Sequence, residues 1–371
     1  MMILIYIFVV LLNIFFSFRK KNSKIVIALT VSYILLCVAG SVDNSDYYNY
    51  HEWYLGNWHP PTVESGYLFL SDFFAGIGLS YWGFLLLTQA FILGVVLFIT
   101  YVYSKEYHIV LALYMSYQIF IDYVQRRNAI AVAFFVLAVY FLANNKKIIY
   151  AMLIICSFLI HKSMIIFLPF VFLNPNTKYS KRMVQLFTGA LVISCIFLFA
   201  NGNELPFLKT ISRITSNSSI LEGKFERYLT SKTRFGFLLP FFTYFINLLL
   251  AFISKNIVAF QLQDSDMKIK KYVNISYYFI CISAFALPLV MINEEFIRYF
   301  RCCNILVYLM VSIVLMVCKK YRFKKLQISQ RVKADYLTYC LVVVVNILSW
   351  IIIYTPNNVV KMFFETNMWI S

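Results

Sequence analysis

The charged side chains that could do chemistry are few in this chain and stand among long apolar stretches. Arginines occur as an adjacent pair, Arg126 and Arg127, and again one helical turn apart, at Arg298 and Arg301. A guanidinium group is always charged, and its planar fork of donors matches the oxygens of a phosphate group. These arginines therefore predict a site for an anionic ligand that carries phosphate.

Both arginine pairs also have a simpler interpretation. Arg126 and Arg127 could reach from a helix start to lipid headgroups. Arg298 and Arg301 stand where the positive end of a helix dipole disfavours cations, so they need a bound anion or the two glutamates at 294–295 as partners. The sequence leaves ligand binding and plain ion pairing open.

Three other side chains are candidates for a catalytic base: His161, Asp46 and Glu64. Imidazole and carboxylate groups can take a proton from an attacking hydroxyl group. His161 interrupts an apolar run, which favours a functional role over that of a core histidine bonded to a backbone carbonyl. Asp46 and Glu64 could equally be solvated loop acids. The sequence does not rank the three.

Aromatic residues gather in the same stretch as the two acids, among them Tyr47, Tyr50 and Tyr67. Their rings could form an aromatic belt at a membrane interface. They could equally stack on sugar rings, and we predict sugar binding for these three tyrosines.

The composition identifies the environment that must hold these groups. Hydrophobic residues make up 61% of the 371 residues and charged residues only 13%. Soluble domains carry roughly 45–50% apolar and about 25% charged residues. Lipid must therefore solvate much of the surface, and we predict a single integral membrane domain over 1–371 with an all-α fold.

The net charge of +17 is interpreted as a sign of membrane topology and not of nucleic-acid binding, because Lys and Arg collect in cytoplasmic loops. The eight cysteines lie in apolar runs without a CxxC motif, so we predict small buried hydrophobic residues and no metal site. Walker A, GxGxxG and GxSxG motifs are all missing, so ATP-driven transport and serine hydrolysis have no support.

The apolar runs predict a polytopic helical bundle of about 11–13 membrane segments, short or re-entrant helices included. The clear spans lie near 2–18, 24–41, 82–103, 183–200, 236–254, 272–292, 299–318 and 336–354, with shorter candidates near 107–122 and 128–143. The piece 67–79 is too short to span and is predicted to be interfacial or re-entrant.

The basic residues orient these segments. The acidic loop after the second span is predicted outside, so 42–81 forms an outer loop with an interfacial helix, and 201–235 forms a second outer loop. The run 148–173 is predicted to be a helical hairpin that turns at His161, because the dense basic run 319–335 then lies inside. All the candidate residues above fall on the outer side, close to membrane depth, where charged groups usually mark a substrate path.

A family resemblance rests on five short motifs and their order. They are Asp46-Tyr47-x-x-Tyr50, Glu64-x-Gly66-Tyr67, Arg127-x-x-Ile130-Ala131, His161-Lys162-Ser163 and Arg298-Tyr299-Phe300. Together they span about residues 40–318, and this stretch resembles the EpsG/Wzy-like family of O-antigen and exopolysaccharide polymerases. The doubling of the arginine at 126–127 and the cysteines after Arg301 are not matched to the family's pattern, so the sequence leaves open which of the two arginines holds phosphate.

The resemblance implies a C-type membrane glycosyltransferase of the bacterial cytoplasmic (inner) membrane, with its active site on the outer side. Such an enzyme moves a growing glycan from undecaprenyl diphosphate onto a lipid-linked repeat unit, as in exopolysaccharide or lipopolysaccharide biosynthesis, and needs no cofactor. The arginines would hold the diphosphate. The expected partners are the undecaprenyl-diphosphate-linked oligosaccharide, the bilayer, a chain-length regulator and a flippase. The alternatives are a flippase or transporter for lipid-linked glycan, an O-antigen ligase, and a membrane O-acyltransferase.

Overall fold

The computed structural model describes residues 2–19, 22–40, 42, 44, 46–61, 63–174, 178–202, 236–262, 266–322, 330–354 and 359–367. These residues form helices joined by short turns, and the described part of the chain contains no β-strand. The prediction of an all-α fold is therefore confirmed.

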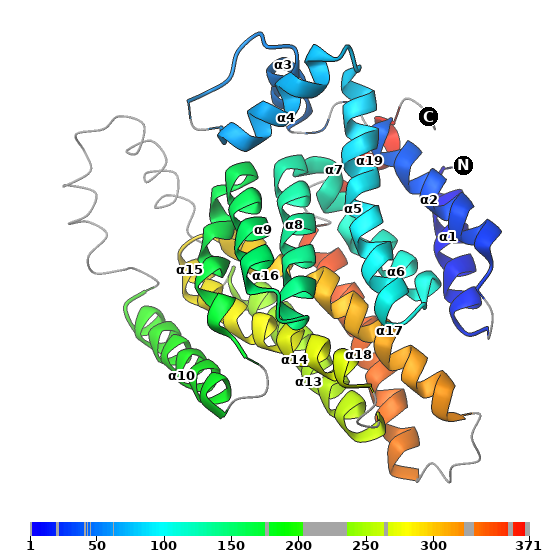
Figure 1. Ribbon diagram of the computed structural model, residues 1–371, viewed down its shortest axis with the longest axis vertical. Helices are drawn as coiled ribbons and strands as arrows, with labels where there is room; N and C mark the ends of the chain where they lie inside the picture. Colours follow the sequence, from blue (N-terminus) through cyan, green and yellow to red (C-terminus); the bar gives the residue numbers. More distant parts are fainter. Residues whose placement is uncertain are drawn as a thin grey trace.

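The first half of the chain forms helices that pass back and forth beside one another (Figure 1). They are α1 (Met2–Ser17), α2 (Lys24–Ala39), α3 (Tyr47–Tyr54), α4 (Ser65–Gly76), α5 (Tyr81–Tyr103), α6 (Tyr107–Leu113), the π-helical turn η1 (Tyr114–Gln118), α7 (Ile119–Val124), α8 (Arg126–Ala143), α9 (Lys147–Ile160) and the 3-10 helix η2 (Lys162–Phe172).

The second half continues the bundle. Its elements are α10 (Lys178–Ala200), α13 (Leu238–Gln261), α14 (Met267–Ile282), η4 (Ser283–Phe285), α15 (Ala286–Ile292), η5 (Glu294–Ile297), α16 (Arg298–Arg301), α17 (Asn304–Arg322), α18 (Gln330–Tyr354) and α19 (Val359–Glu365). Helix α13 packs against α14, α17 and α18, which makes it the centre of this half.

Six helical stretches of the described chain are long and apolar enough to cross a membrane. They are Tyr81–Tyr103, Arg126–Ala143, Lys178–Ala200, Leu238–Gln261, Met267–Ile292 and Glu295–Lys320. Shorter apolar stretches lie in α1, α2, α9, η2 and α18. The long and short segments together confirm the predicted polytopic transmembrane bundle.

The predicted hairpin at His161 is present. His161 has an extended backbone that ends α9, and η2 folds back along α9. The hydroxyl of Tyr150, near the start of α9, donates a hydrogen bond to the carbonyl of Phe167 in η2. In one continuous helix these residues, 17 positions apart, would be separated by about 25 Å. The turn of the hairpin therefore carries His161 to the end of the bundle where α8 begins.

The predicted span 107–122 is divided into α6, η1 and α7. A π-helical turn adds a residue to the helix repeat and often marks a functional position. Here it lets Tyr114 and Gln118 both donate hydrogen bonds to Asp122 in α7. Sequence periodicity cannot show such a turn, because the added residue changes the helical phase only locally.

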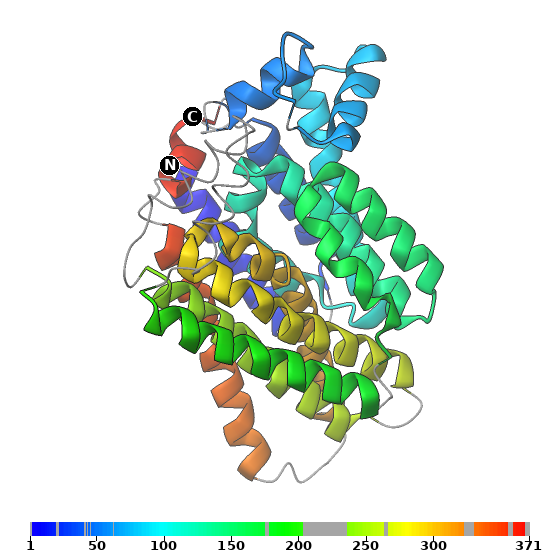
Figure 2. The same cartoon turned by 90° about the vertical axis from the view of Figure 1, so that its left-hand side faces the viewer.

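Helices α3 and α4 form a small cap at one end of the bundle, near α19 and the first turn of α1 (Figures 1 and 2). Helix α4 packs against α9 at Gly66, where an added Cβ would lie 2.7 Å from the carbonyl oxygen of Leu159. The outer placement of 42–81 stays a prediction. The predicted outer loop 201–235 lies outside the described residues from 203 onward.

Candidate functional site

Helix α8 starts with two arginines that point into different surroundings. Gln125 breaks the helix before them with a non-helical backbone (φ −100°, ψ 63°). Arg127 turns toward the cap, where its Nη1 lies 2.5 Å from Oε2 of Glu64 and its Nε donates to the Tyr50 hydroxyl at 3.4 Å. Its guanidinium also lies 5.6 Å and 5.1 Å from the ring centres of Tyr50 and Trp53.

Glu64 joins three elements at one carboxylate. It is the N-cap residue of α4, and its Oε2 contacts Arg127 at the start of α8. Its Oε1 accepts a hydrogen bond at 3.3 Å from the backbone N–H of Lys162, in the turn between α9 and η2. The close approach of Gly66 to Leu159 fixes the backbone two residues further on. Glu64 is therefore held in place from both sides.

His161 lies at the same turn, within electrostatic range of Glu64, Arg298 and Arg127. Its Nδ1 is 2.7 Å from the Ser163 hydroxyl oxygen, and the backbone N–H of Ser163 also points at it, at 3.4 Å. A nitrogen that accepts from a backbone N–H cannot carry a proton itself. Neutral His161 then carries its proton on Nε2, which makes that nitrogen a donor to a ligand.

Asp46 is the N-cap residue of α3, but its side chain makes no capping hydrogen bond. It is half-buried and lies within electrostatic range of both Arg127 and Arg298. Burial raises the pKa of Asp46, and the two arginines offset part of that rise. Within the part of the chain that the structure describes, its carboxylate has no side-chain hydrogen bond, so it can accept a proton or a ligand hydroxyl.

Arg298 and Arg301 also differ from each other in exposure and in the partners that they contact. Arg298 is partly exposed, and its Nη2 lies 2.8 Å from Oε2 of Glu295. Arg301 is 2% exposed and donates a hydrogen bond to the side chain of Gln125, at the break before α8. Arg298 can therefore meet a ligand, whereas Arg301 supports the break that carries Arg127.

Arg126 is buried, with only 3% of its surface exposed. Its Nη1 donates to Oε1 of Gln89 at 3.1 Å, and its Nη2 donates to the carbonyl of Val38 at 3.0 Å. Gln89 in turn donates to the hydroxyl of Tyr114, which donates to Asp122. We call Arg126, Gln89, Tyr114 and Asp122 the buried network.

Sequence reasoning missed the buried network beyond Arg126. Asp122 is a lone acid in an apolar run, and an acid within a membrane segment is by default a residue with a specific partner. The sequence therefore carried a signal that marks Asp122. Gln89 and Tyr114 gave none, because nothing in their spacing reveals which helices meet.

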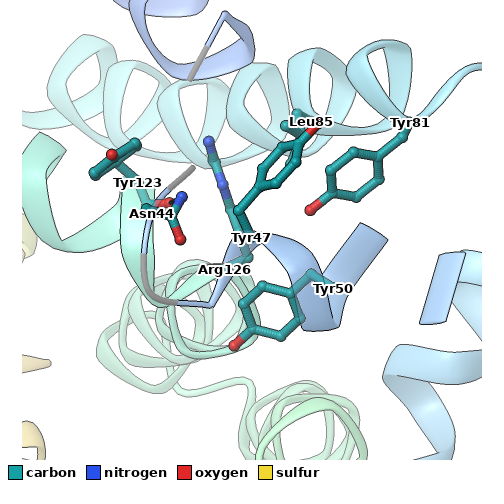
Figure 3. Close-up of a pocket in the computed structure, with 7 residues that line it drawn as sticks. All are labelled: Asn44, Tyr47, Tyr50, Tyr81, Leu85, Tyr123 and Arg126. Carbon is teal, nitrogen blue, oxygen red and sulfur yellow. Dashed lines mark hydrogen bonds between the residues drawn. The ribbon is translucent and has the colours of Figure 1, made fainter. Parts of the chain in front are cut away.

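The tyrosines predicted to bind sugar lie mostly inside the cap. Tyr67 is fully buried and Tyr50 is 5% exposed, with ring centres 5.6 Å apart. Tyr47 keeps some exposure and stacks on His51 at 5.7 Å. Figure 3 shows Tyr47, Tyr50 and Arg126 around a narrow crevice, which has no room for a sugar ring in this conformation.

The structure thus brings five of the predicted residues to one place: Asp46, Glu64, Arg127, His161 and Arg298. We call these five the open site. It combines two partly exposed guanidinium groups and an imidazole with two carboxylates, of which that of Asp46 makes no side-chain hydrogen bond to the described residues. Among the described residues, no three His, Cys, Asp or Glu side chains are grouped so that they could hold a metal ion.

Comparison with known proteins gives one match. The family model described as the EpsG family matches residues 25–361, which is most of the chain. No curated protein and no solved structure matches it. The match contains every residue of the open site and of the buried network. This chain therefore belongs to the EpsG family.

Proposed function

We propose that the protein is a polysaccharide polymerase that transfers a growing glycan from undecaprenyl diphosphate to a lipid-linked repeat unit, on the outer face of the bacterial cytoplasmic membrane. Membership of the EpsG family and the multi-pass helical bundle support a membrane enzyme of this class. The observation that carries the proposal is the position of Asp46, whose carboxylate lies within electrostatic range of both Arg127 and Arg298. A proton acceptor and two groups suited to a diphosphate thus influence one another electrostatically.

The chemistry of glycan transfer needs both parts. An acceptor hydroxyl attacks the anomeric carbon, a new glycosidic bond forms, and the bond from that carbon to the diphosphate oxygen breaks. The hydroxyl proton passes to the base, for which we assign Asp46. The departing diphosphate gains negative charge, which Arg127 and Arg298 stabilise. The donor is already activated, so the reaction needs no nucleotide and no cofactor.

The remaining residues take supporting roles in this proposal. His161 presents its Nε2 proton to a sugar hydroxyl or a phosphate oxygen. Arg126 and Arg301, which the sequence predicted as diphosphate ligands, act by holding the break before α8. Of the three tyrosines predicted to bind sugar, Tyr47 is the one that is partly exposed. The partners are the lipid-linked glycan and the bilayer, and a chain-length regulator and a flippase would serve the same pathway.

The test is a reaction with purified protein and one substrate. Given only the lipid-diphosphate-linked repeat unit in vesicles, the protein should produce a ladder of longer lipid-linked glycans. Arg127→Ala, purified in parallel, should give no ladder. A flippase would instead move the unchanged lipid across the bilayer without forming a bond, and that result from an active preparation would overturn the proposal.

A further inference from the structure

The open site must release the diphosphate product after it has stabilised the leaving group. The diphosphate of the donor is a diester, whereas the product has a free terminal phosphate and therefore one more ionisable oxygen. Arginines that stabilise the charge developing on the leaving group also hold the finished product more tightly than the donor. Release of the product would then limit the cycle unless another group competes for the same arginines.

The position of Glu64 allows it to compete with the diphosphate for an arginine. Its Oε2 lies 2.5 Å from Nη1 of Arg127, one of the two arginines assigned to the diphosphate. Nη2 of Arg127 makes no hydrogen bond with any residue that the structure describes. About a quarter of the Arg127 side chain is exposed, so a ligand can reach the guanidinium and draw it from Glu64.

Two contacts limit how far the Glu64 carboxylate can move when a ligand binds Arg127. Its other oxygen is held by the backbone N–H of Lys162 at 3.3 Å. Its backbone starts α4, which rests on α9 with no space for even a methyl group at Gly66. Glu64 therefore stays within reach of Arg127 while the diphosphate is bound, and the ion pair can form again as soon as the product loosens.

We propose that Glu64 competes with the diphosphate for Arg127 and thereby drives release of the diphosphate product. Glu64 is then neither base nor ligand but a positioning residue that acts through Arg127. The proposal rests on the proposed function, since it takes a diphosphate as the leaving group. It assigns to Glu64 an effect opposite in sign to that of the arginines: removal of its charge should strengthen anion binding.

The test compares Glu64→Gln with the unchanged protein in detergent. The amide keeps the size of the side chain and an acceptor for Lys162, but loses the charge. Inorganic pyrophosphate serves as the probe, and calorimetry or the fluorescence of Trp53, whose ring centre lies 5.1 Å from the Arg127 guanidinium, reports binding. We expect Glu64→Gln to bind pyrophosphate about fivefold more tightly. The control is Asp72→Asn, which neutralises an exposed acid on the same helix and should leave the affinity unchanged.

Kinetics provide the second readout. Glu64→Gln should form the first glycosidic bond at the normal rate in a single turnover, then slow in the steady state, with a burst of product that the unchanged protein lacks. If Glu64→Gln cannot be purified folded, Glu64→Asp, which shortens the side chain and breaks the contact, should show the same changes at smaller size.

The possible failures can be told apart. If the unchanged protein binds no pyrophosphate and makes no ladder, the proposed function itself is wrong. If it does both, but the Glu64 variants bind pyrophosphate equally or more weakly, Glu64 does not compete for Arg127. A slower single turnover with no burst would assign Glu64 to the chemical step and would equally overturn the proposal.

Discussion

Arg126 and Arg127 are neighbours in the sequence, yet they belong to two regions that differ in burial and in how completely their charged groups are hydrogen-bonded. The buried network around Arg126 joins its guanidinium to Asp122 through hydrogen bonds between side chains that are almost fully enclosed. The open site around Arg127 leaves part of the guanidinium exposed, and it includes Asp46, whose carboxylate lacks a side-chain partner among the described residues. Enclosed charges with complete partners fix a structure, whereas exposed charges with incomplete partners can bind and react.

Substitution of Asp46 and of Asp122 should give the largest difference in activity between the two regions. Asp46→Asn removes the assigned base, so kcat should fall by roughly 10²–10⁴-fold while donor binding stays near normal. Asp122→Asn should instead lower the free energy of unfolding by about 1–3 kcal/mol, because Tyr114 and Gln118 lose a charged acceptor. Turnover of the folded Asp122→Asn protein should stay close to normal.

Ladder assays and thermal melting in detergent measure the two effects. If Asp46→Asn kept its turnover and Asp122→Asn lost it, the base would lie in the buried network, and the division into two regions would be wrong.

The two arginines give the next contrast, by substitution to lysine. Lysine keeps the charge but loses the planar fork. At Arg127 this should lower kcat/KM by about 100-fold with little change in melting temperature. At Arg126 a single ammonium group would replace the two terminal nitrogens that donate to Gln89 and Val38. Arg126→Lys should therefore cost roughly 2 kcal/mol of stability and leave turnover of the folded protein within a few fold. Equal loss of turnover in both variants would show that both arginines contact the donor.

The same contrast shows how far the sequence alone could lead. Apolar run length identifies the spans because the bilayer thickness is fixed. The break at His161 and the basic run 319–335 predicted the hairpin correctly. Residue type and the predicted topology placed the three candidate bases and all four arginines on one side of the membrane. The structure brings five of these residues together and separates Arg126 and Arg301 from them.

The direction in which each arginine side chain points could not be predicted from the sequence. Arg126 and Arg127 have the same side chain and follow each other, and their separation depends on the backbone of Gln125 (φ −100°, ψ 63°). The burial of Tyr50 and Tyr67 likewise depends on how the cap packs. No periodic pattern in a helix of eight residues fixes that packing.

Gly66 ties the cap to the open site, and its substitution should have an intermediate effect. An alanine Cβ would lie within 2.8 Å of the backbone and Cβ of Leu159, so α4 must move away from α9. Overpacking of this kind costs about 1–3 kcal/mol. It also displaces Glu64 from Arg127 and should lower kcat by roughly tenfold, because release of the product slows.

Gly76→Ala is the matched control for this substitution, because a Cβ there meets nothing within 4 Å. Comparison of melting temperature and activity in the two variants checks the prediction. A Gly66→Ala protein as active and stable as Gly76→Ala would mean that the cap does not position the site.

The smallest expected effect concerns the pH dependence of the open site. Asp46 acts as a base only when ionised, so kcat/KM should fall as the pH drops through its pKa, which burial raises above 3.8. Arg127 and Arg298 stabilise the ionised form and keep that pKa lower than burial alone would set it. Arg298→Gln removes part of this stabilisation. The acid limb of the pH profile should therefore move to higher pH, by less than about one unit because Arg298 is partly exposed.

Glu295→Gln supplies a control of opposite sign. Glu295 lies 2.8 Å from Arg298 and neutralises part of its charge. Without that carboxylate Arg298 acts more strongly on Asp46, so the acid limb should move to lower pH. The profiles of kcat/KM at limiting donor measure both shifts. Shifts in the same direction for both variants, or an acid limb that survives Asp46→Asn unchanged, would mean that the titrating base is another group, and His161 would be the next candidate to substitute.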